Sequence, residues 1–252
     1  MSVKITKKTY QARGQFNGGE ILENKPIGFP REGGELKPYS NLFYWSHAWS
    51  DEGSTIGLHP HQGFEILSFV FDGQIEHYDT SDEEWKPIEK GGAQIIRSGN
   101  GISHSERLNA GAHMFQIWFD PNLARALEKP ASYNDYRDAD FPVEEKEGMR
   151  IKTYKGDGAP LMMDSPGVEI KEISLEAGNH QLPTESDKIY SYYLIEGEVS
   201  TSEGDMEAHD FLRVEDETNL SIEVKESSRF FLVVNPKELD YLTYYQSAMA
   251  NA

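Results

Sequence analysis

Four side chains able to bind a metal ion lie in two short segments of the chain. The segment GLHPHQGFE contains His59 and His61, and the segment GNGISHSE contains His104 and Glu106. Because alternate residues of a β-strand share a face, each pair should point in one direction, and Glu65 should point the same way as the first pair. If the two strands face each other inside a barrel, the three imidazoles and the Glu106 carboxylate converge.

This set of ligands suits a divalent transition metal. Three imidazoles and one carboxylate bind borderline ions such as Fe(II), Mn(II), Ni(II), Cu(II) or Zn(II), with open positions for water or substrate. A single histidine in a strand is usually a core or surface residue instead, and we interpret His47, His180 and His209 in that way. For the metal-binding set this explanation is weak, because ionisable side chains on an inward face are costly to bury without a common partner.

Nearby polar and aromatic residues are secondary candidates. We interpret His77 and His113 as rim or surface residues rather than ligands. Gln116 could line a pocket, although a buried amide bonded to the backbone is the more common arrangement. The aromatic run at residues 43–45 could shape the mouth of a pocket, although aromatic residues of β proteins more often belong to the core.

The elements that position these residues are predominantly short β-strands. Short apolar segments are bounded by Gly, Pro, Asp and Asn, which is typical of strands separated by tight turns. We predict strands at residues 64–71, 74–79, 93–97, 114–119, 168–175, 190–195, 211–214, 220–224 and 230–234. Peripheral helices are expected at residues 121–128 and from residue 236 to about 248.

An internal repeat indicates two similar halves. The sequence SFVFDGQI from Ser68 resembles YYLIEGEV from Tyr192, 124 residues further on, and each predicts a strand, an acidic-glycine turn and a returning strand. Duplication of a β unit explains this repeat, although such hairpins also recur by chance in all-β proteins. We expect a metal-binding domain at residues 1–131, a connecting segment at 132–148, and a second domain at 149–252 that ends in a short helical tail.

Composition limits the partners of the protein. The chain has 43 acidic and 24 basic residues, and the resulting charge of −19 repels phosphate backbones and anionic membranes. It contains no cysteine, so a metal must be held by nitrogen and oxygen ligands. Its start lacks the apolar core of a secretory signal, and no run approaches the roughly 20 apolar residues of a membrane span. We expect a cytoplasmic protein that binds neither nucleic acid nor membranes directly.

The metal-binding motifs also carry a family resemblance. Four consecutive motifs resemble those of the pirins, a family of the cupin superfamily. These motifs are HPHQGFEIL from His59, IEHYD from Ile75, GNGISHSE from Gly99 and HMFQIW from His113. The resemblance is dense over about residues 40 to 120. It implies an all-β bicupin fold of two jelly-roll-type barrels in tandem with short peripheral helices. It also implies iron as the usual metal, bound by His59, His61, His104 and Glu106, with Glu65 in a supporting position.

The second half departs from this pattern. At the offset of 124 residues, Pro183, Glu185 and Ile189 stand where the first half has His59, His61 and Glu65. We therefore expect a C-terminal barrel without metal. The chain also ends without the Gly-Pro-Phe-rich stretch that many pirins carry near the C-terminus, which limits the assignment to any one subfamily.

The resemblance implies three classes of function. Some pirins resemble quercetinases, which cleave the central ring of a flavonol with O2, and Glu106 would then accept the proton of the substrate hydroxyl. The alternative is a non-catalytic, metal- or redox-responsive protein that acts through a protein partner, for which the acidic surface favours basic partners. A sugar-phosphate isomerase ranks last, because only Arg97 and Arg107 lie near the motifs to hold a phosphate.

Overall fold

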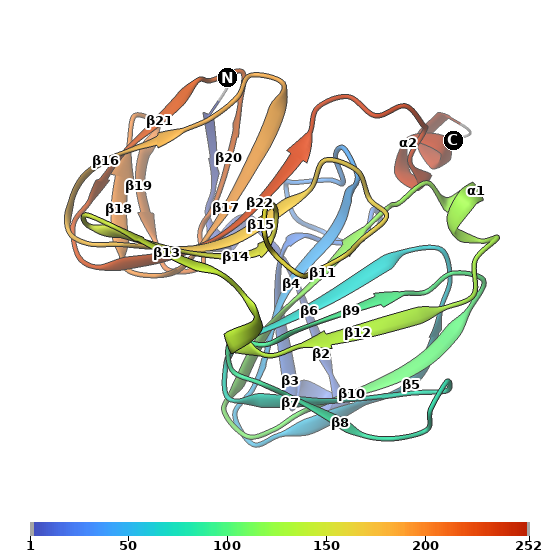
Figure 1. Ribbon diagram of the computed structural model, residues 1–252. Helices are drawn as coiled ribbons and strands as arrows, with labels where there is room; N and C mark the ends of the chain where they lie inside the picture. The colour runs from blue at the N-terminus through green and yellow to red at the C-terminus, as the bar shows by residue number, and fades with distance from the viewer. Residues whose placement is uncertain (1–2, 251–252) are drawn as a thin grey trace. The chain divides into compact units, whose positions relative to one another are not determined.

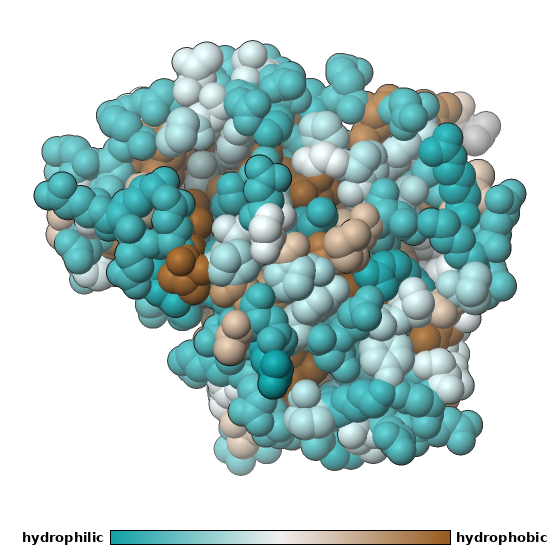
Figure 2. All heavy atoms as spheres, viewed as in Figure 1, coloured by the Kyte–Doolittle hydropathy of each residue, from teal (hydrophilic) through white to brown (hydrophobic). Residues whose placement is uncertain are grey.

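The computed structural model describes residues 3–250, and these residues form an all-β protein with a few short helical turns (Figure 1). The chain divides into two compact units, each built from a seven-stranded and a four-stranded antiparallel sheet. The predicted fold class, two jelly-roll-type barrels in tandem, is confirmed by this architecture. No helix within residues 3–250 is long and apolar enough to cross a membrane. The face seen in Figure 2 is mostly hydrophilic, and hydrophobic residues appear on it in scattered groups.

The metal-binding motifs lie in the N-terminal barrel. Its seven-stranded sheet has the order β12 (Ser132–Tyr136), β9 (Ala93–Arg97), β6 (Glu65–Asp72), β11 (Ala112–Phe119), β4 (Leu42–Ser50), β3 (Ile21–Ile27) and β2 (Ala12–Phe16). Its four-stranded sheet has the order β5 (Ser54–His61), β10 (Ile102–Leu108), β7 (Gln74–Asp79) and β8 (Lys86–Glu89). The strands at both motifs therefore belong to the smaller sheet.

The C-terminal barrel repeats this plan. Its larger sheet has the order β1 (Val3–Thr6), β20 (Phe211–Glu215), β17 (Lys188–Glu196), β22 (Ser228–Pro236), β15 (Glu169–Leu175), β14 (Met149–Lys155) and β13 (Val143–Lys146). Its smaller sheet has the order β16 (Gly178–Pro183), β21 (Asn219–Val224), β18 (Glu198–Thr201) and β19 (Gly204–Glu207). Strand for strand, the two halves have the same order.

The repeat seen in the sequence corresponds to equivalent hairpins of the two barrels. β6 turns into β7 at Gly73, whose φ is 66°, and β17 turns into β18 at Gly197, whose φ is 102°. Both values lie in the left-handed region, which glycine adopts without steric cost. A common strand order together with equivalent turns supports duplication over chance recurrence of hairpins.

The borders of the two units differ from those expected from the sequence. β1 pairs with β20, so residues 3–10 belong to the C-terminal unit although they begin the chain. The segment expected to be a connection contains β12, which pairs with β9, and β13, which pairs with β14. Residues 163–166 and 240–250 return to the N-terminal unit. These strands were not predicted because an edge strand buries few side chains and shows little apolar alternation.

The helical segments are shorter than expected. α1 covers Leu123–Ala126, and Asn122 caps it by accepting from the Arg125 backbone N–H. α2 covers Tyr244–Ala250, and short 3-10 turns cover Lys8–Tyr10, Asn17–Gly19 and Asp138–Asp140. The predicted helix from residue 236 begins later, because β22 continues to Pro236.

The interiors of the two barrels differ in chemistry. The C-terminal barrel is filled by one apolar cluster that includes Leu182 on β16 and both Leu220 and Ile222 on β21. The equivalent strands of the N-terminal barrel, β5 and β10, carry His59 and His104 instead. The C-terminal barrel has therefore kept the strands and filled the equivalent region with aliphatic side chains.

Candidate metal centre

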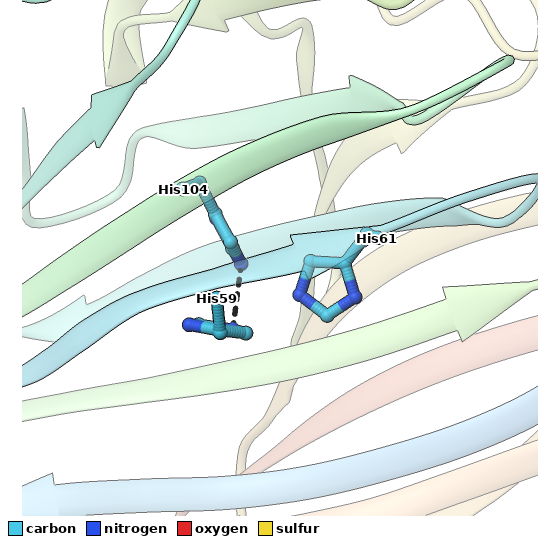
Figure 3. Close-up of side chains that lie close together, drawn as sticks. All are labelled: His59, His61 and His104. Carbon is cyan, nitrogen blue, oxygen red and sulfur yellow. Dashed lines mark hydrogen bonds between the residues drawn. The ribbon is translucent and has the colours of Figure 1, made fainter.

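The three predicted histidine ligands come together on two neighbouring strands of the smaller sheet. His59 on β5 is the direct cross-strand partner of His104 on β10, and His61 is the partner of Ile102. The ring centroids of the three imidazoles lie 4.5 to 4.7 Å apart. Figure 3 shows the three rings turned toward one another. The strands are adjacent within one sheet rather than opposite each other, so the cross-strand register creates the cluster.

The distances within this cluster fit a shared metal ion. One nitrogen from each ring can be chosen so that the three atoms lie within 4.8 Å of one another. His59 Nε2 and His104 Nε2 are 3.0 Å apart. Two metal–nitrogen bonds of about 2.1 Å that meet at a right angle would hold their nitrogens about 3.0 Å apart. This separation is that of the hydrogen bond between the two rings, and it also fits two neighbouring ligands of one ion.

The hydrogen bonds around the rings leave nitrogen lone pairs available. His59 Nδ1 lies 2.8 Å from the Gly57 carbonyl oxygen, so this nitrogen carries the proton and Nε2 carries the lone pair. His61 Nε2 is buried and has no hydrogen-bond partner. A buried polar atom without a partner is costly, and a metal ion would remove that cost. The residues present therefore fit the group that the family implies.

Burial keeps two of these imidazoles neutral at physiological pH. Desolvation, with the neighbouring His104 and His59, lowers the pKa of His61 to about 3. Desolvation, with His59 and His77, lowers the pKa of His104 to about 2. A neutral imidazole is the form that donates its lone pair to a metal.

Glu106 lies beside the histidine cluster and is held by neighbouring side chains. The Gln116 amide nitrogen donates to both carboxylate oxygens at 2.7 Å, and Ser68 Oγ donates at 3.3 Å. A register irregularity between His104 and Glu106 on β10 changes the local alignment with β5. Among the residues that the structure describes, Glu106 is not one of the three groups within 4.8 Å. Its role as a fourth ligand stays a prediction.

Glu65 does not support the metal site. Its carboxylate accepts hydrogen bonds from the backbone N–H of Asp164 at 2.6 Å and of Ser165 at 2.9 Å, and from Ser165 Oγ at 2.6 Å. The expectation that it points the same way as His59 and His61 was wrong. β5 ends at His61 and β6 begins at Glu65 in the other sheet, so strand periodicity does not continue across the turn.

Two secondary predictions were also wrong. His77 is 1% exposed rather than at the rim, and its Nε2 lies 3.0 Å from Asp79 Oδ2. Its ring centroid lies 5.3 Å from that of His104. Gln116 bonds to the Glu106 side chain instead of the backbone and lines the cavity. Each residue lies next to a polar side chain of the site, His104 for His77 and Glu106 for Gln116, which a general preference for apolar interiors does not predict.

A cavity of about 620 Å³ opens next to the imidazoles. This volume is within the range of about 300 to 1,000 Å³ that is common for small-molecule sites. Aromatic and apolar side chains form much of its wall, and polar groups stand at separate places along it. The lining includes His59, His61, Glu106, Gln116, Trp118, Tyr44, Phe29, Glu23, Lys25 and Glu32.

Comparison with known proteins relates part of the chain to one family. The model of the family "Pirin" matches residues 34–119, which contain the three histidines, Glu106 and Gln116. A relative from Zymomonas mobilis named "Putative quercetin 2,3-dioxygenase" is 26% identical over 91% of this chain and 97% of its own length. A relative of the same name from Pseudomonas aeruginosa is 28% identical over 79% of this chain and 85% of its own length. The family-model match over residues 34–119 and these relatives support a pirin-family cupin.

Solved structures agree with this two-barrel fold. The bacterial pirin YhhW of Escherichia coli, solved in complex with nickel(II), has a TM-score of 0.75 at 21% identity, and the match covers 94% of this chain and 100% of YhhW. A mutant of the oxalate decarboxylase OxdC of Bacillus subtilis has a TM-score of 0.66 at 13% identity over 96% of this chain and 80% of its own. At these identities the structures establish the fold alone.

One pair of charged side chains in the cavity wall was not identified from the sequence. Glu23 and Lys25 lie two residues apart on β3, and the structure places both in the cavity wall. Charged residues at that spacing within a largely apolar strand are a signal that could have identified an inward polar pair. The arginines considered from the sequence lie elsewhere, since Arg97 bonds to Asn134 and Arg107 pairs with Glu76.

The remaining histidines do not enter the cavity wall. His47 Nε2 lies 3.1 Å from His113 Nδ1, and His180 Nε2 lies 2.8 Å from the Glu176 carbonyl oxygen. Among residues 3–250, the three histidines on β5 and β10 are the set grouped closely enough to hold a metal ion.

Proposed function

We propose that this protein is a metal-dependent dioxygenase that acts on a flavonol-type aromatic substrate with O2. The observation that carries the proposal is a cluster of three imidazoles, two of them kept neutral by burial. His59 and His61 of this cluster line a partly aromatic cavity of about 620 Å³. The names of several relatives, "Putative quercetin 2,3-dioxygenase", support the same reaction.

His59, His61 and His104 would hold one divalent ion, with Glu106 as the fourth ligand. Fe(II) is the favoured metal, and Mn, Ni, Cu or Zn would also suit these nitrogen and oxygen donors. When bound, such an ion supplies a Lewis acid and, in the case of iron, a one-electron redox centre. The nickel(II) complex of YhhW supports metal binding.

The side chains of the chain itself would position the substrate and move its proton. Glu106 is 2% exposed, and we assign it the role of base toward the hydroxyl of the flavonol. Gln116 fixes the Glu106 carboxylate, and Trp118 Nε1 in turn donates to Gln116 Oε1 at 3.1 Å. This chain of side chains keeps the base in one orientation, as a positioned proton acceptor requires.

Aromatic residues would bind the planar rings of the substrate. Trp118 packs edge-on against His61, with ring centroids 4.8 Å apart. Phe29 stacks on Tyr44 at 4.5 Å and meets Trp118 at 5.3 Å. An aromatic wall that begins at the histidine cluster would favour a flat ligand and reduce access of water to it.

A phosphorylated substrate fits this cavity poorly. Among the lining residues that the structure describes, Lys25 is the one cation, and it is paired with both Glu23 and Glu32. A phosphate site needs unpaired cations or a cluster of backbone N–H groups. This observation supports the dioxygenase over a sugar-phosphate isomerase.

Oxygen uptake on quercetin tests the proposal. Protein loaded with one equivalent of Fe(II) should consume O2 with quercetin, and Glu106→Gln should lose at least about 100-fold in rate, within the range attributed to a positioned base. Glu76→Gln, on the neighbouring strand β7, is the control and should retain activity. Fully loaded, folded protein without O2 uptake would contradict the enzyme and favour the non-catalytic, metal-responsive alternative.

A further inference from the structure

A buried charged cluster lies in the cavity wall apart from the metal-binding side chains. Lys25 is 4% exposed, and its Nζ lies 2.8 Å from Glu32 Oε1 and 3.1 Å from Glu23 Oε2. Glu23 Oε1 accepts from Tyr44 Oη at 2.8 Å and from Ser46 Oγ at 2.9 Å. The roles assigned to the metal ligands and to Glu106 use none of these groups.

The aromatic wall links this cluster to the metal site. The Trp118 ring contacts His61 on one side, and its centroid lies 5.5 Å from that of Tyr44 on the other. Lys25 Nζ lies 5.6 Å from the centroid of the Tyr44 ring. A planar ligand that lies along this wall with one edge at the histidines would therefore extend toward Lys25.

The charges of the cluster select the kind of group that it can bind. Two carboxylates and one ammonium leave one net negative charge, which repels a ligand carboxylate or phosphate. Tyr44 stays neutral, because burial and the nearby Glu23 hold the pKa of its phenol well above the usual value. Glu32 Oε2 already accepts from the Phe29 backbone N–H at 2.9 Å. A carboxylate oxygen has two lone pairs and can also accept from a hydroxyl group, and the two ion pairs leave one Lys25 donor for a hydroxyl oxygen.

We propose that Glu23, Lys25 and Glu32 form a second recognition site of the cavity, which binds phenolic hydroxyl groups remote from the metal-binding edge of the ligand. The inference rests on the proposed function and narrows it to polyhydroxylated aromatic substrates. Gly14 also lines the cavity here, and a Cβ at this position would overlap Glu23 Oε2 and Lys25 Nζ. A side chain at position 14 would have to displace the ends of Glu23 and Lys25, so glycine leaves the ion pair its place in the wall.

The test compares two flavonols that share the 3-hydroxyl and the carbonyl but differ in the 5-, 7-, 3′- and 4′-hydroxyls, of which the last three are remote from the metal-binding edge. Quercetin carries them, whereas 3-hydroxyflavone keeps the hydroxyl and carbonyl of the metal-binding edge and lacks the others. Dissociation constants are measured without O2 on protein loaded with nickel(II), so that binding is separated from turnover. The variants are Glu32→Gln and Lys25→Met. Glu35→Gln, an exposed residue of the same loop outside the cavity lining, is the matched control.

We expect the variants of the cluster to lose affinity for quercetin selectively. Wild type and Glu35→Gln should bind quercetin about tenfold or more tightly than 3-hydroxyflavone, the size expected for one hydrogen bond to a charged group. Glu32→Gln and Lys25→Met should reduce this preference at least about threefold and leave the affinity for 3-hydroxyflavone unchanged. Because Glu32→Gln preserves the side-chain shape, it tests recognition of the hydroxyl groups even if Lys25→Met fails to fold.

Two results would overturn the inference. An unchanged preference in a folded Glu32→Gln protein would show that the cluster does not recognise hydroxyl groups. Equal weakening of both ligands would assign the cluster a purely structural role. Selective binding without any later O2 uptake would contradict only the dioxygenase and leave the recognition site intact.

Discussion

His59 and His104 are direct cross-strand partners on β5 and β10, and their Nε2 atoms lie 3.0 Å apart. This relationship explains why two motifs 45 residues apart in sequence form one site. A one-residue change of register would move one imidazole to the other face of the sheet. The barrel therefore positions the metal ligands through strand pairing rather than through flexible loops.

Stability of the metal-free protein should fall as the pH falls below about 6.5. The pKa of His61 is lowered to about 3 and that of His104 to about 2, so the unfolded chain gains protons between pH 6.5 and these values while the folded protein does not. Each histidine should reduce the free energy of unfolding by up to about 1.4 kcal/mol per pH unit in this window. Urea denaturation with a chelator at pH 7 and pH 5 measures the change.

The double variant His61→Asn, His104→Asn is the control for this pH dependence. It lacks both shifted groups, so its free energy of unfolding should change less between pH 7 and pH 5. A wild type and a double variant with the same pH dependence would show that these histidines are not buried in the neutral form.

Gln116→Leu should lower turnover while metal binding is retained. The leucine is similar in size but removes the amide that donates to both oxygens of Glu106 at 2.7 Å. A base without its orienting partner should lose about tenfold or more in rate, because positioning contributes directly to the barrier. Steady-state O2 uptake together with metal analysis checks this. Turnover at the wild-type rate would remove Gln116 from the mechanism.

Glu65→Ala should destabilise the protein without loss of metal. The substitution removes the acceptor of the Asp164 and Ser165 backbone N–H groups, and each buried donor left unpaired costs about 1 to 3 kcal/mol. Thermal or urea unfolding measures the effect, with the exposed Glu89→Ala as control. Loss of bound metal from folded Glu65→Ala protein would show that this carboxylate does contribute to the metal site.

Much of the fold could be predicted from the sequence because its inner strands follow simple rules. β6, β9, β11, β17 and β22 are short apolar runs bounded by turn residues, and all were predicted within a few residues. Edge strands such as β1 and β12 were missed, because pairing with a distant partner rather than their own side chains defines them. The inner strands β3, β4 and β14 were also not predicted. The repeat of the β6–β7 hairpin correctly indicated duplicated halves.

Only those features of the site that depend on the type of the ligands and on their local spacing could be predicted. Those signals identified the three histidines that the structure groups together. The direction of Glu65, the burial of His77 and the cluster at Lys25 depend on which sheet a strand joins, and local sequence does not contain that information. The role of Glu106 as a ligand, the native metal and the cytoplasmic location stay predictions.

Metal content of protein purified without added metal tests the central claim most directly. Elemental analysis should find close to one equivalent of a divalent transition metal in the wild type, much less in His61→Ala, and an unchanged amount in His180→Ala, which alters a histidine of the C-terminal barrel. Wild-type protein without metal, even after reconstitution with Fe(II) or nickel(II), or His61→Ala protein with undiminished metal, would contradict the assignment of this site.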